Sequence, residues 1–302
     1  MSFAAIEVNN LSKRYGDLVA VKNASFSVPL GTICGFVGPN GSGKTTTIRM
    51  LLGLIKPSSG TASIIGNPIS HPERYLNEVG ALIEGPAFYP ALSGIENLRV
   101  LAKLGGIPIS RCQELMQLVG LSGREKDKYK TYSLGMKQRL GIAAALLPNP
   151  KLLILDEPVN GLDPAGIQEV RDLLENLATN GVTVFVSSHL LSEIEMISEH
   201  LVMLRKGEVI FAGPISELLH RNKPTIIARP SSKSSLQYLA ELINKAGHVA
   251  QIEDDHVRVE AEDDFAVQLN KLAFENGIVL AQLTPVRPSL EETFFELTEG
   301  DK

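Results

Sequence analysis

The sequence predicts an α/β fold built on a parallel sheet, followed by a smaller α+β domain. Three observations lead to this prediction. An apolar run at residues 32–37 enters a glycine-rich loop and then a segment with helical spacing. Residues 152–186 repeat the order strand, helix, strand, which requires a parallel sheet with polar groups at the carboxyl ends of its strands. The pattern of predicted strands and helices changes near Glu217, which indicates a second domain.

Length and composition agree with two soluble domains. The 302 residues exceed the usual size of one hydrophobic core. The net charge of −5 argues against nucleic acid as a partner, because such binding is normally driven by a basic face. A basic leader and a run of about 18 apolar residues are both absent, so we expect a cytoplasmic chain whose membrane role needs a partner. Cys34 and Cys112 are expected to be reduced structural thiols.

The first elements are predicted to be antiparallel strands. Polar and apolar residues alternate near residues 6–8 and 24–28, and Tyr15 lies in the turn between them. After the glycine-rich loop, a helix carries apolar residues at helical spacing from Ile48 to Ile55. Because proline cannot continue a helix, we expect this helix to stop at Pro57. Short strands are predicted to follow at residues 62–66 and 79–83.

A helical subdomain is predicted at about residues 90–147. Ser93 and Ser110 each precede a glutamate or glutamine by three residues. This is the spacing of a capping box, so both serines are expected to cap helices. A third helix is predicted from Ser133 to Leu147, where a proline-rich segment ends it.

The remainder of the chain predicts the rest of the parallel sheet and then a separate unit. A buried strand at residues 152–155 precedes a helix that ends near Gly181 and a strand at residues 182–186. Beyond them, the element order matches a ferredoxin-like βαββαβ unit, with segments at residues 225–228, 234–246, 248–253, 256–260, 263–276 and 278–283. We therefore expect a large domain at residues 1–215 and a small α+β domain for packing, dimerisation or regulation at residues 216–302.

The glycine-rich loop has the pattern of a phosphate-binding loop. It fits G-x-x-x-x-G-K-[ST] at every fixed position, with the residues Gly38, Pro39, Asn40, Gly41, Ser42, Gly43, Lys44 and Thr45. Glycines let successive N–H groups point inward, and the helix that follows adds its positive end. Lys44 is expected to reach the terminal phosphates, Thr45 to hold Mg²⁺, and Thr46 to bind the nucleotide beside them. The loop therefore predicts a nucleoside triphosphate site.

Three polar residues at strand ends are candidates for catalysis. Asp156 follows four apolar residues, so its carboxylate is expected to hold Mg²⁺ near Thr45. Glu157, the next residue, is expected to accept the proton of a water that attacks the γ-phosphate. His189 is expected to donate a hydrogen bond to the γ-phosphate or to position that water. The alternatives are an acidic helix N-terminus for the carboxylate pair and a surface or cap residue for His189.

Because these motifs occur together and in order, residues 1 to about 215 resemble the nucleotide-binding subunits of ATP-binding cassette (ABC) transporters. The turn at residues 160–163 belongs to the same set of motifs. The resemblance implies a P-loop NTPase fold with an N-terminal antiparallel β subdomain, and an ATPase that uses ATP and Mg²⁺. It implies a membrane-spanning permease partner, a second nucleotide-binding subunit and a location at the inner face of the cell membrane. It also implies that Tyr15 stacks on adenine, with simple packing as the alternative.

Two motifs depart from the pattern of that family. The signature usually reads Leu-Ser-Gly-Gly-Gln, whereas residues 132–136 read Tyr-Ser-Leu-Gly-Met. Ser133 and Gly135 are kept at a helix N-terminus, where the resemblance places them against the γ-phosphate bound by the other subunit. Glu84 stands where the family has a glutamine that contacts Mg²⁺ and senses the membrane subunit. A carboxylate also ligates Mg²⁺, and the alternative is a solvated turn glutamate.

Two further stretches are similar to exporters that confer resistance to bacitracin, lantibiotics and related peptide antibiotics. They are residues 84–90, Glu-Gly-Pro-Ala-Phe-Tyr-Pro, and residues 288–295, Pro-Ser-Leu-Glu-Glu-Thr-Phe-Phe. Phe88 and Tyr89 would lie beside the surface where a cytoplasmic helix of the permease docks, or else pack in the core. The function predicted is an ATP-hydrolysing subunit that drives peptide-antibiotic export. The alternative is a nucleotide-gated interaction or sensor module in which ATP binding matters more than turnover.

Overall fold

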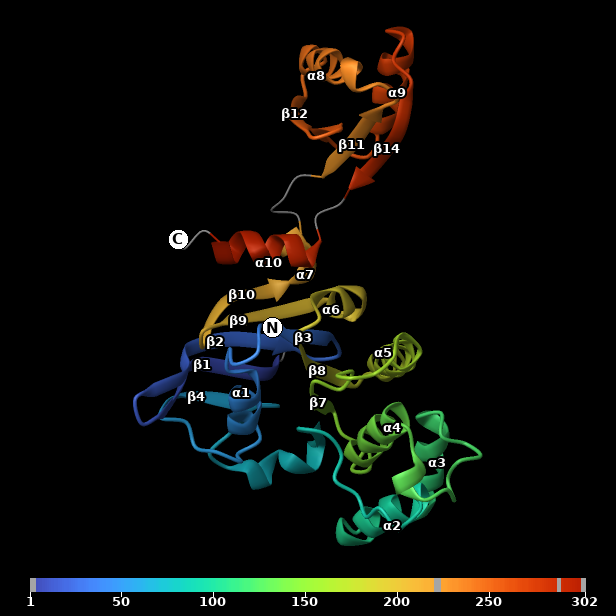
Figure 1. Cartoon of the computed structure of the whole chain (residues 1–302). Helices are drawn as coiled ribbons and strands as arrows, with labels where there is room; N and C mark the ends of the chain where they lie inside the picture. Colours follow the sequence, from blue (N-terminus) through green and yellow to red (C-terminus); the bar gives the residue numbers. More distant parts are fainter. Residues whose placement is uncertain (1–3, 220–223, 287–288, 300–302) are drawn as a thin grey trace. The chain divides into compact units, whose positions relative to one another are not determined.

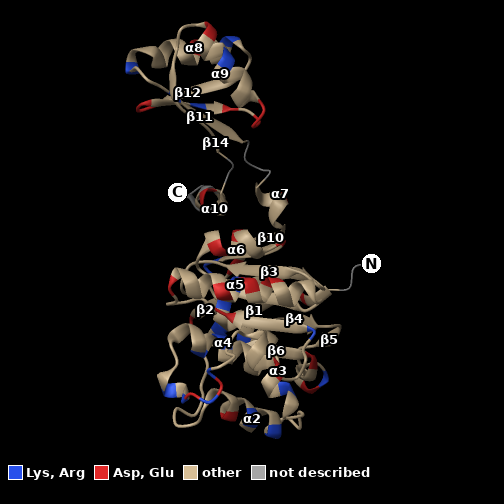
Figure 2. Ribbon diagram, turned by 90° about the vertical axis from the view of Figure 1, so that its right-hand side faces the viewer, with Lys and Arg blue, Asp and Glu red and all other residues tan. Residues whose placement is uncertain are grey.

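The structure, a computed structural model, describes residues 4–219, 224–286 and 289–299 (Figure 1). The chain divides into two compact units, residues 1–215 and 216–302. Among the described residues, none of the helices combines the length and the apolar character needed to cross a bilayer. Charged residues of both signs lie on the surface helices of each unit, for example on α5 (Pro164–Thr179) and α8 (Leu236–Lys245) (Figure 2).

A six-stranded sheet forms the centre of the first unit. Its strands lie in the order β10-β9-β3-β8-β7-β6, with the bounds β3 (Ile33–Val37), β6 (Val79–Leu82), β7 (Leu152–Asp156), β8 (Thr183–Ser188), β9 (His200–Arg205) and β10 (Glu208–Pro214). Five of these strands run parallel, and β10 pairs antiparallel with β9. Every residue of β3, β7 and β8 is buried, which explains their continuous apolar runs. The predicted α/β fold is confirmed.

The N-terminal antiparallel sheet is also confirmed. Its order is β2-β1-β4-β5, with the bounds β1 (Ala4–Tyr15), β2 (Leu18–Pro29), β4 (Ser59–Ile64) and β5 (Asn67–Pro68). The two sheets share a core in which Phe26 of β2 lies 5.8 Å from Phe36 of β3 and 6.2 Å from Phe185 of β8, measured between ring centroids. Cys34 and Cys112 are buried and free of disulfide bonds.

The helix that follows the loop is shorter than the sequence predicted. α1 (Lys44–Leu51) ends before Gly53, whose φ of 70° lies in the left-handed region that glycine adopts at helix ends. The prediction that Pro57 stops this helix is therefore wrong. The remaining helices of the sheet layer are α5 and α6 (Leu191–Ile197), and α7 (Ile215–Leu219) follows β10. Short 3₁₀ turns lie at Pro72–Arg74, Leu76–Glu78, Tyr129–Thr131 and Lys233–Ser235.

The helical subdomain consists of α2 (Gly94–Leu104), α3 (Ser110–Leu118) and α4 (Leu134–Ala145), which cluster together in Figure 1. Within it, α4 packs against β6. Ser93 and Glu96 form the predicted capping box at the start of α2. The corresponding prediction for Ser110 is wrong, because Ile109 is the N-cap of α3 and Ser110 is already helical. Pro108 explains the difference: its fixed φ favours the first turn, and its carbonyl accepts a hydrogen bond from Arg111 N at 3.1 Å.

The second unit has the predicted ferredoxin-like order. Its elements are β11 (Thr225–Pro230), α8, β12 (Val249–Glu253), β13 (His256–Glu260), α9 (Phe265–Glu275) and β14 (Leu280–Val286). The sheet order is β12-β13-β11-β14, with every pair antiparallel. Leu239 of α8, Leu269 of α9 and Val257 of β13 are fully buried in its core. α10 (Leu290–Glu299) begins after Ser289, which exchanges hydrogen bonds with Glu292. Pro288 of the antibiotic-exporter stretch lies outside the described residues.

Candidate nucleotide site

The phosphate-binding loop connects β3 to α1 and is closely packed against neighbouring backbone. A Cβ atom at Gly38 would lie 2.2 Å from Leu204 O, and one at Gly43 would lie 2.5 Å from Ala20 O. Gly43 also has a φ of 108°, which side chains rarely adopt. These two positions therefore require glycine. They hold the loop between the end of β9 and β2, so that its backbone curls around the start of α1.

Lys44 is the buried cation of the loop, with 6% of its side chain exposed. Its Nζ donates a hydrogen bond to Gly38 O at 2.7 Å and lies 3.2 Å from Glu157 Oε1. A buried ammonium is costly unless it is paired with a carboxylate or with another anion. The arrangement keeps the charge of Lys44 at the loop, where a phosphate oxygen would replace these partners.

Asp156 and Thr45 lie together, as the sequence predicted. Thr45 Oγ1 donates to Asp156 Oδ2 at 2.7 Å, and Ser187 Oγ donates to Asp156 Oδ1 at 2.5 Å. The hydroxyl of Thr45 and the carboxylate of Asp156 are hard oxygen donors and fit Mg²⁺, which usually completes its shell with water and phosphate oxygens. In the described part of the chain, the structure has no cluster of three or more His, Cys, Asp or Glu side chains that could hold a metal.

Glu157 is held in an unusual backbone conformation beside Asp156. Its φ is 51°, in the left-handed region, and its N–H contacts Ser187 Oγ at 3.0 Å and Ser187 O at 3.2 Å. Non-glycine residues in this region are uncommon and tend to lie at functional sites. The Glu157 carboxylate stands between two partners, because Oε2 lies 2.7 Å from His189 Nδ1 while Oε1 faces Lys44. The structure thus joins Lys44, Glu157 and His189 in one chain of contacts.

A cavity of about 550 Å³ opens beside the loop. It is lined by Tyr15, Leu18, Val19, Ala20, Asn40, Gly41, Gly43, Lys44, Thr45, Thr46, Glu157 and Lys206. Tyr15 is 47% exposed, and Lys13 Nζ lies 5.1 Å from the centroid of its ring. The ring is therefore not packed in the core, and it lies at the mouth of the cavity with Lys13 over one face. From the sequence, Ser187 could be placed at a strand end but was given no role, and Lys206 was missed, because no motif marks either residue.

Three predicted site residues lie apart from this cavity. Ser133 caps α4 and accepts a hydrogen bond from Met136 N at 3.2 Å, and Gly135 follows in the first turn of the helix. Neither residue lines the cavity. Glu84, with a φ of 57°, forms an ion pair with Arg49 of α1. Within the described residues, no hydrogen bond or ion pair joins Glu84 to Thr45 or Asp156.

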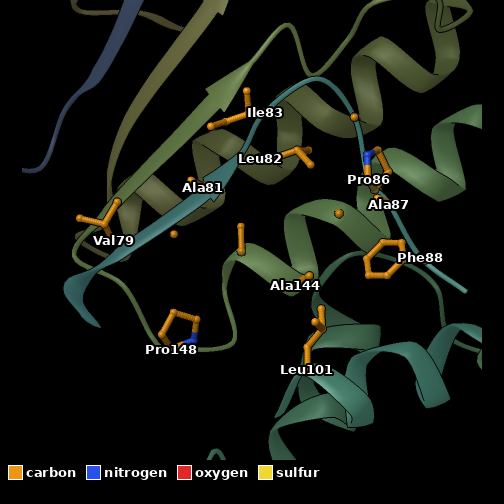
Figure 3. Close-up of a pocket in the computed structure, with 14 residues that line it drawn as sticks. Val79, Ala81, Leu82, Ile83, Pro86, Ala87, Phe88, Leu101, Ala144 and Pro148 are labelled. Carbon is orange, nitrogen blue, oxygen red and sulfur yellow. The ribbon is translucent and has the colours of Figure 1, made fainter. Parts of the chain in front are cut away.

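A second groove, of about 360 Å³, lies between β6 and the helical subdomain. Figure 3 shows β6 on one side of it and Leu101 of α2 and Ala144 of α4 on the other, with Phe88 at the end of the groove. Phe88 packs edge-on against Tyr129, with 5.2 Å between the ring centroids, and is half-buried. Tyr89 is 63% exposed. The side chains that line the groove are thus apolar, and an exposed aromatic residue lies nearby.

Comparison with known proteins identifies similar chains. The family model described as "ABC transporter" matches residues 21–160. The bacitracin transport ATP-binding protein BcrA of Bacillus licheniformis is 42% identical over 298 residues, which cover 98% of this chain and 97% of BcrA. The lantibiotic transport ATP-binding protein SrtF of Streptococcus pyogenes is 41% identical over 205 residues, which cover 68% of this chain and 89% of SrtF.

Solved structures share the fold. CbiO1 of Clostridium perfringens, part of the ABC transporter complex cbiONQ, superposes with a TM-score of 0.66 at 27% identity, covering 72% of this chain and 91% of cbiO1. An ATP-binding cassette in a dimeric post-hydrolysis state, bound to ADP and Pi, superposes with a TM-score of 0.61 at 25% identity. The match covers 70% of this chain and 98% of that cassette.

Proposed function

The chain belongs to the ATP-binding subunits of ABC transporters and is an ATPase, and from this premise we propose that it drives the export of peptide antibiotics of the bacitracin or lantibiotic type. One observation carries the choice of substrate. The similarity to BcrA covers 98% of this chain, so it includes the second unit as well as the cassette. We therefore propose that residues 1–215 form the motor and that residues 216–302 form an accessory domain of this exporter type.

In the proposed mechanism, the loop and Lys44 bind the phosphates and Tyr15 stacks on adenine. Thr45 and Asp156 would hold Mg²⁺, which neutralises phosphate charge when bound. When the ammonium of Lys44 binds phosphate oxygens in place of Glu157, His189 remains as the partner of the Glu157 carboxylate. Glu157 then accepts the proton of the attacking water, and His189 holds the carboxylate in place and faces the γ-phosphate. Glu84, paired with Arg49 in this structure, is proposed to turn toward the metal in the working state.

ABC ATP-binding subunits work with membrane permeases and dimerise. We propose partners for two surfaces of this chain, the N-terminus of α4 and the groove between β6 and the helical subdomain. Ser133 and Gly135 would meet the γ-phosphate held by a second copy, because a helix N-terminus favours an anion. The groove between β6 and the helical subdomain would receive a cytoplasmic helix of a membrane-spanning permease. Its apolar walls and the exposed Tyr89 support that role. The chain would then lie at the inner face of the cell membrane.

The test of this proposal is antibiotic resistance in a strain that lacks the subunit. Resistance to bacitracin and to a lantibiotic is measured after complementation with the wild-type chain or with Lys44→Ala, which removes the cation that binds phosphate. The proposal predicts that the wild-type chain restores resistance and that Lys44→Ala does not. Equal sensitivity with and without the wild-type chain would overturn the choice of substrate.

A second candidate function is a nucleotide-gated interaction module. It is favoured by two observations, the altered signature around Ser133 and the pairing of Glu84 with Arg49 rather than with the metal-site residues. Affinity purification separates the two functions. Recovery of the chain with a multi-spanning membrane protein supports the exporter, whereas recovery with a soluble partner and no stimulated ATP turnover supports the module.

A further inference from the structure

Lys206 lies at the mouth of the nucleotide cavity but belongs to none of the motifs of the site. It occupies the turn between β9 and β10 and lines the same cavity as Lys44 and Tyr15. Its φ of 49° is in the left-handed region, as is common in tight hairpin turns. The side chain is exposed. A lysine in such a place is either a solvated turn residue or a ligand contact, and the packing of the turn bears on the choice.

The turn is fastened to the phosphate-binding loop. Gly207 N donates to Ser42 O at 2.9 Å, and Gly207 O accepts from Lys22 N at 2.8 Å. A Cβ atom at Gly207 would lie 3.0 Å from Ala20 O, so the turn fits closely against β2. Lys22 also forms an ion pair with Glu208, on the other side of the turn. The backbone of Lys206 is therefore held at a fixed place relative to the loop, although its side chain extends into solvent.

The charges that line the cavity also point to Lys206. Three charged side chains are among the lining residues, namely Lys44, Glu157 and Lys206. Lys44 and Glu157 form an ion pair at 3.2 Å, so their charges largely cancel. Within the described residues, the ammonium of Lys206 has neither an ion pair nor a hydrogen bond. Lys206 thus supplies the unopposed positive charge of a cavity whose proposed ligand carries several negative charges.

We propose that Lys206 is a phosphate-binding residue of this nucleotide site, which contacts the phosphate chain from the β9–β10 turn. This inference rests on the nucleotide site proposed above and adds a residue to it. A charge-assisted contact to phosphate strengthens binding, but exposure to solvent weakens the contact. We therefore expect that removing the charge of Lys206 weakens the affinity for ATP by about threefold to thirtyfold. The effect decreases at high salt, because screening acts on exposed charges.

The experiment measures equilibrium binding of ATP, ADP, AMP and adenosine to the full chain in a series of salt concentrations. Lys206→Met keeps the length of the apolar stem and removes the charge, whereas Lys206→Arg keeps the charge. Lys103→Met, on the exposed side of α2 and outside the cavity, is the matched control. Lys44→Met tests the site itself. Thermal unfolding of each variant verifies that it is folded.

The proposal predicts that Lys206→Met weakens binding of ATP and ADP but not of adenosine, that Lys206→Arg restores it, and that Lys103→Met has no effect. It also predicts a shallower salt dependence for Lys206→Met. Equal ATP affinity of Lys206→Met and wild type, with binding lost in Lys44→Met, would show that Lys206 is only a solvated turn residue. Unchanged affinity in Lys44→Met would instead show that the nucleotide site is misplaced. An equal loss for ATP and adenosine would contradict a phosphate contact.

Discussion

Glu157→Gln is the substitution that separates nucleotide binding from turnover. The carboxylate stands between Lys44 at 3.2 Å and His189 at 2.7 Å. Glutamine keeps the shape and one carbonyl oxygen, but it cannot accept a proton from water. A general base contributes about 10²–10⁴ in rate. At about 1.36 kcal/mol for each factor of ten, the barrier should rise by about 3–5 kcal/mol. Binding of ATP should stay the same or tighten, because a negative charge beside the phosphates is removed.

The assay compares phosphate release at saturating MgATP with equilibrium binding of ATP. Glu175→Gln is the control, since Glu175 is an exposed residue of α5 that does not line the cavity. A kcat within twofold of the wild type would refute Glu157 as the base. A parallel loss of ATP affinity and thermal stability would show that Glu157 serves the fold of the loop rather than the reaction.

Three further substitutions test other contacts of the site. Ser187→Ala leaves Asp156 Oδ1 without its hydroxyl partner, while the Glu157 N–H keeps its contact with Ser187 O, so the free energy of unfolding in urea should fall by about 1–3 kcal/mol. A loss below about 0.5 kcal/mol would contradict this coupling. Tyr15→Ala should weaken ATP binding by about 1–3 kcal/mol because stacking is lost, whereas Tyr15→Phe should bind ATP as the wild type does. Equal affinities of the wild type and both variants would exclude stacking. A double-mutant cycle of Arg49→Ala and Glu84→Gln should give a coupling of about 0–1 kcal/mol in urea unfolding, because the two side chains are 37% and 62% exposed; a larger value would indicate a desolvated pair.

The fold was predictable where periodicity and caps agree. Strand β13 coincides with the predicted residues 256–260, and the Ser93 capping box forms as expected. The errors lie at helix ends, where neighbouring residues compete. Pro108 moves the N-cap of α3 from Ser110 to Ile109, and Gly53 ends α1 before Pro57. Propensity rules identify residues that can end a helix, and Gly53 and Pro57 are both such residues. Because Gly53 comes first along the chain, the helix ends there.

The positions of site residues could be predicted where the residue directly follows a strand. They could not be predicted where a contact depends on how two strands are paired in register. Asp156 and Glu157 follow an apolar run, so their place at the edge of the sheet follows from chain order alone. Ser187 is the register partner of Asp156 across β7 and β8. Its hydroxyl reaches both acidic residues for that reason. Lys206 depends likewise on a turn fastened to Ser42, at a long distance along the chain. Sequence alone carries neither register nor such contacts.

The altered signature keeps the groups that would meet a phosphate. A helix N-terminus attracts an anion through its backbone N–H groups and dipole. The first turn of α4 carries no acidic residue that would repel one. At Gly135 a Cβ atom would find its nearest neighbour, Leu162 Cδ2, at 3.9 Å, so the backbone there is accessible. The three substitutions relative to the family pattern, Tyr132, Leu134 and Met136, change side chains, whereas the N–H groups and the hydroxyl of Ser133 remain. Because these groups do not line the cavity of their own chain, we infer that each copy offers them to the phosphates of a second copy.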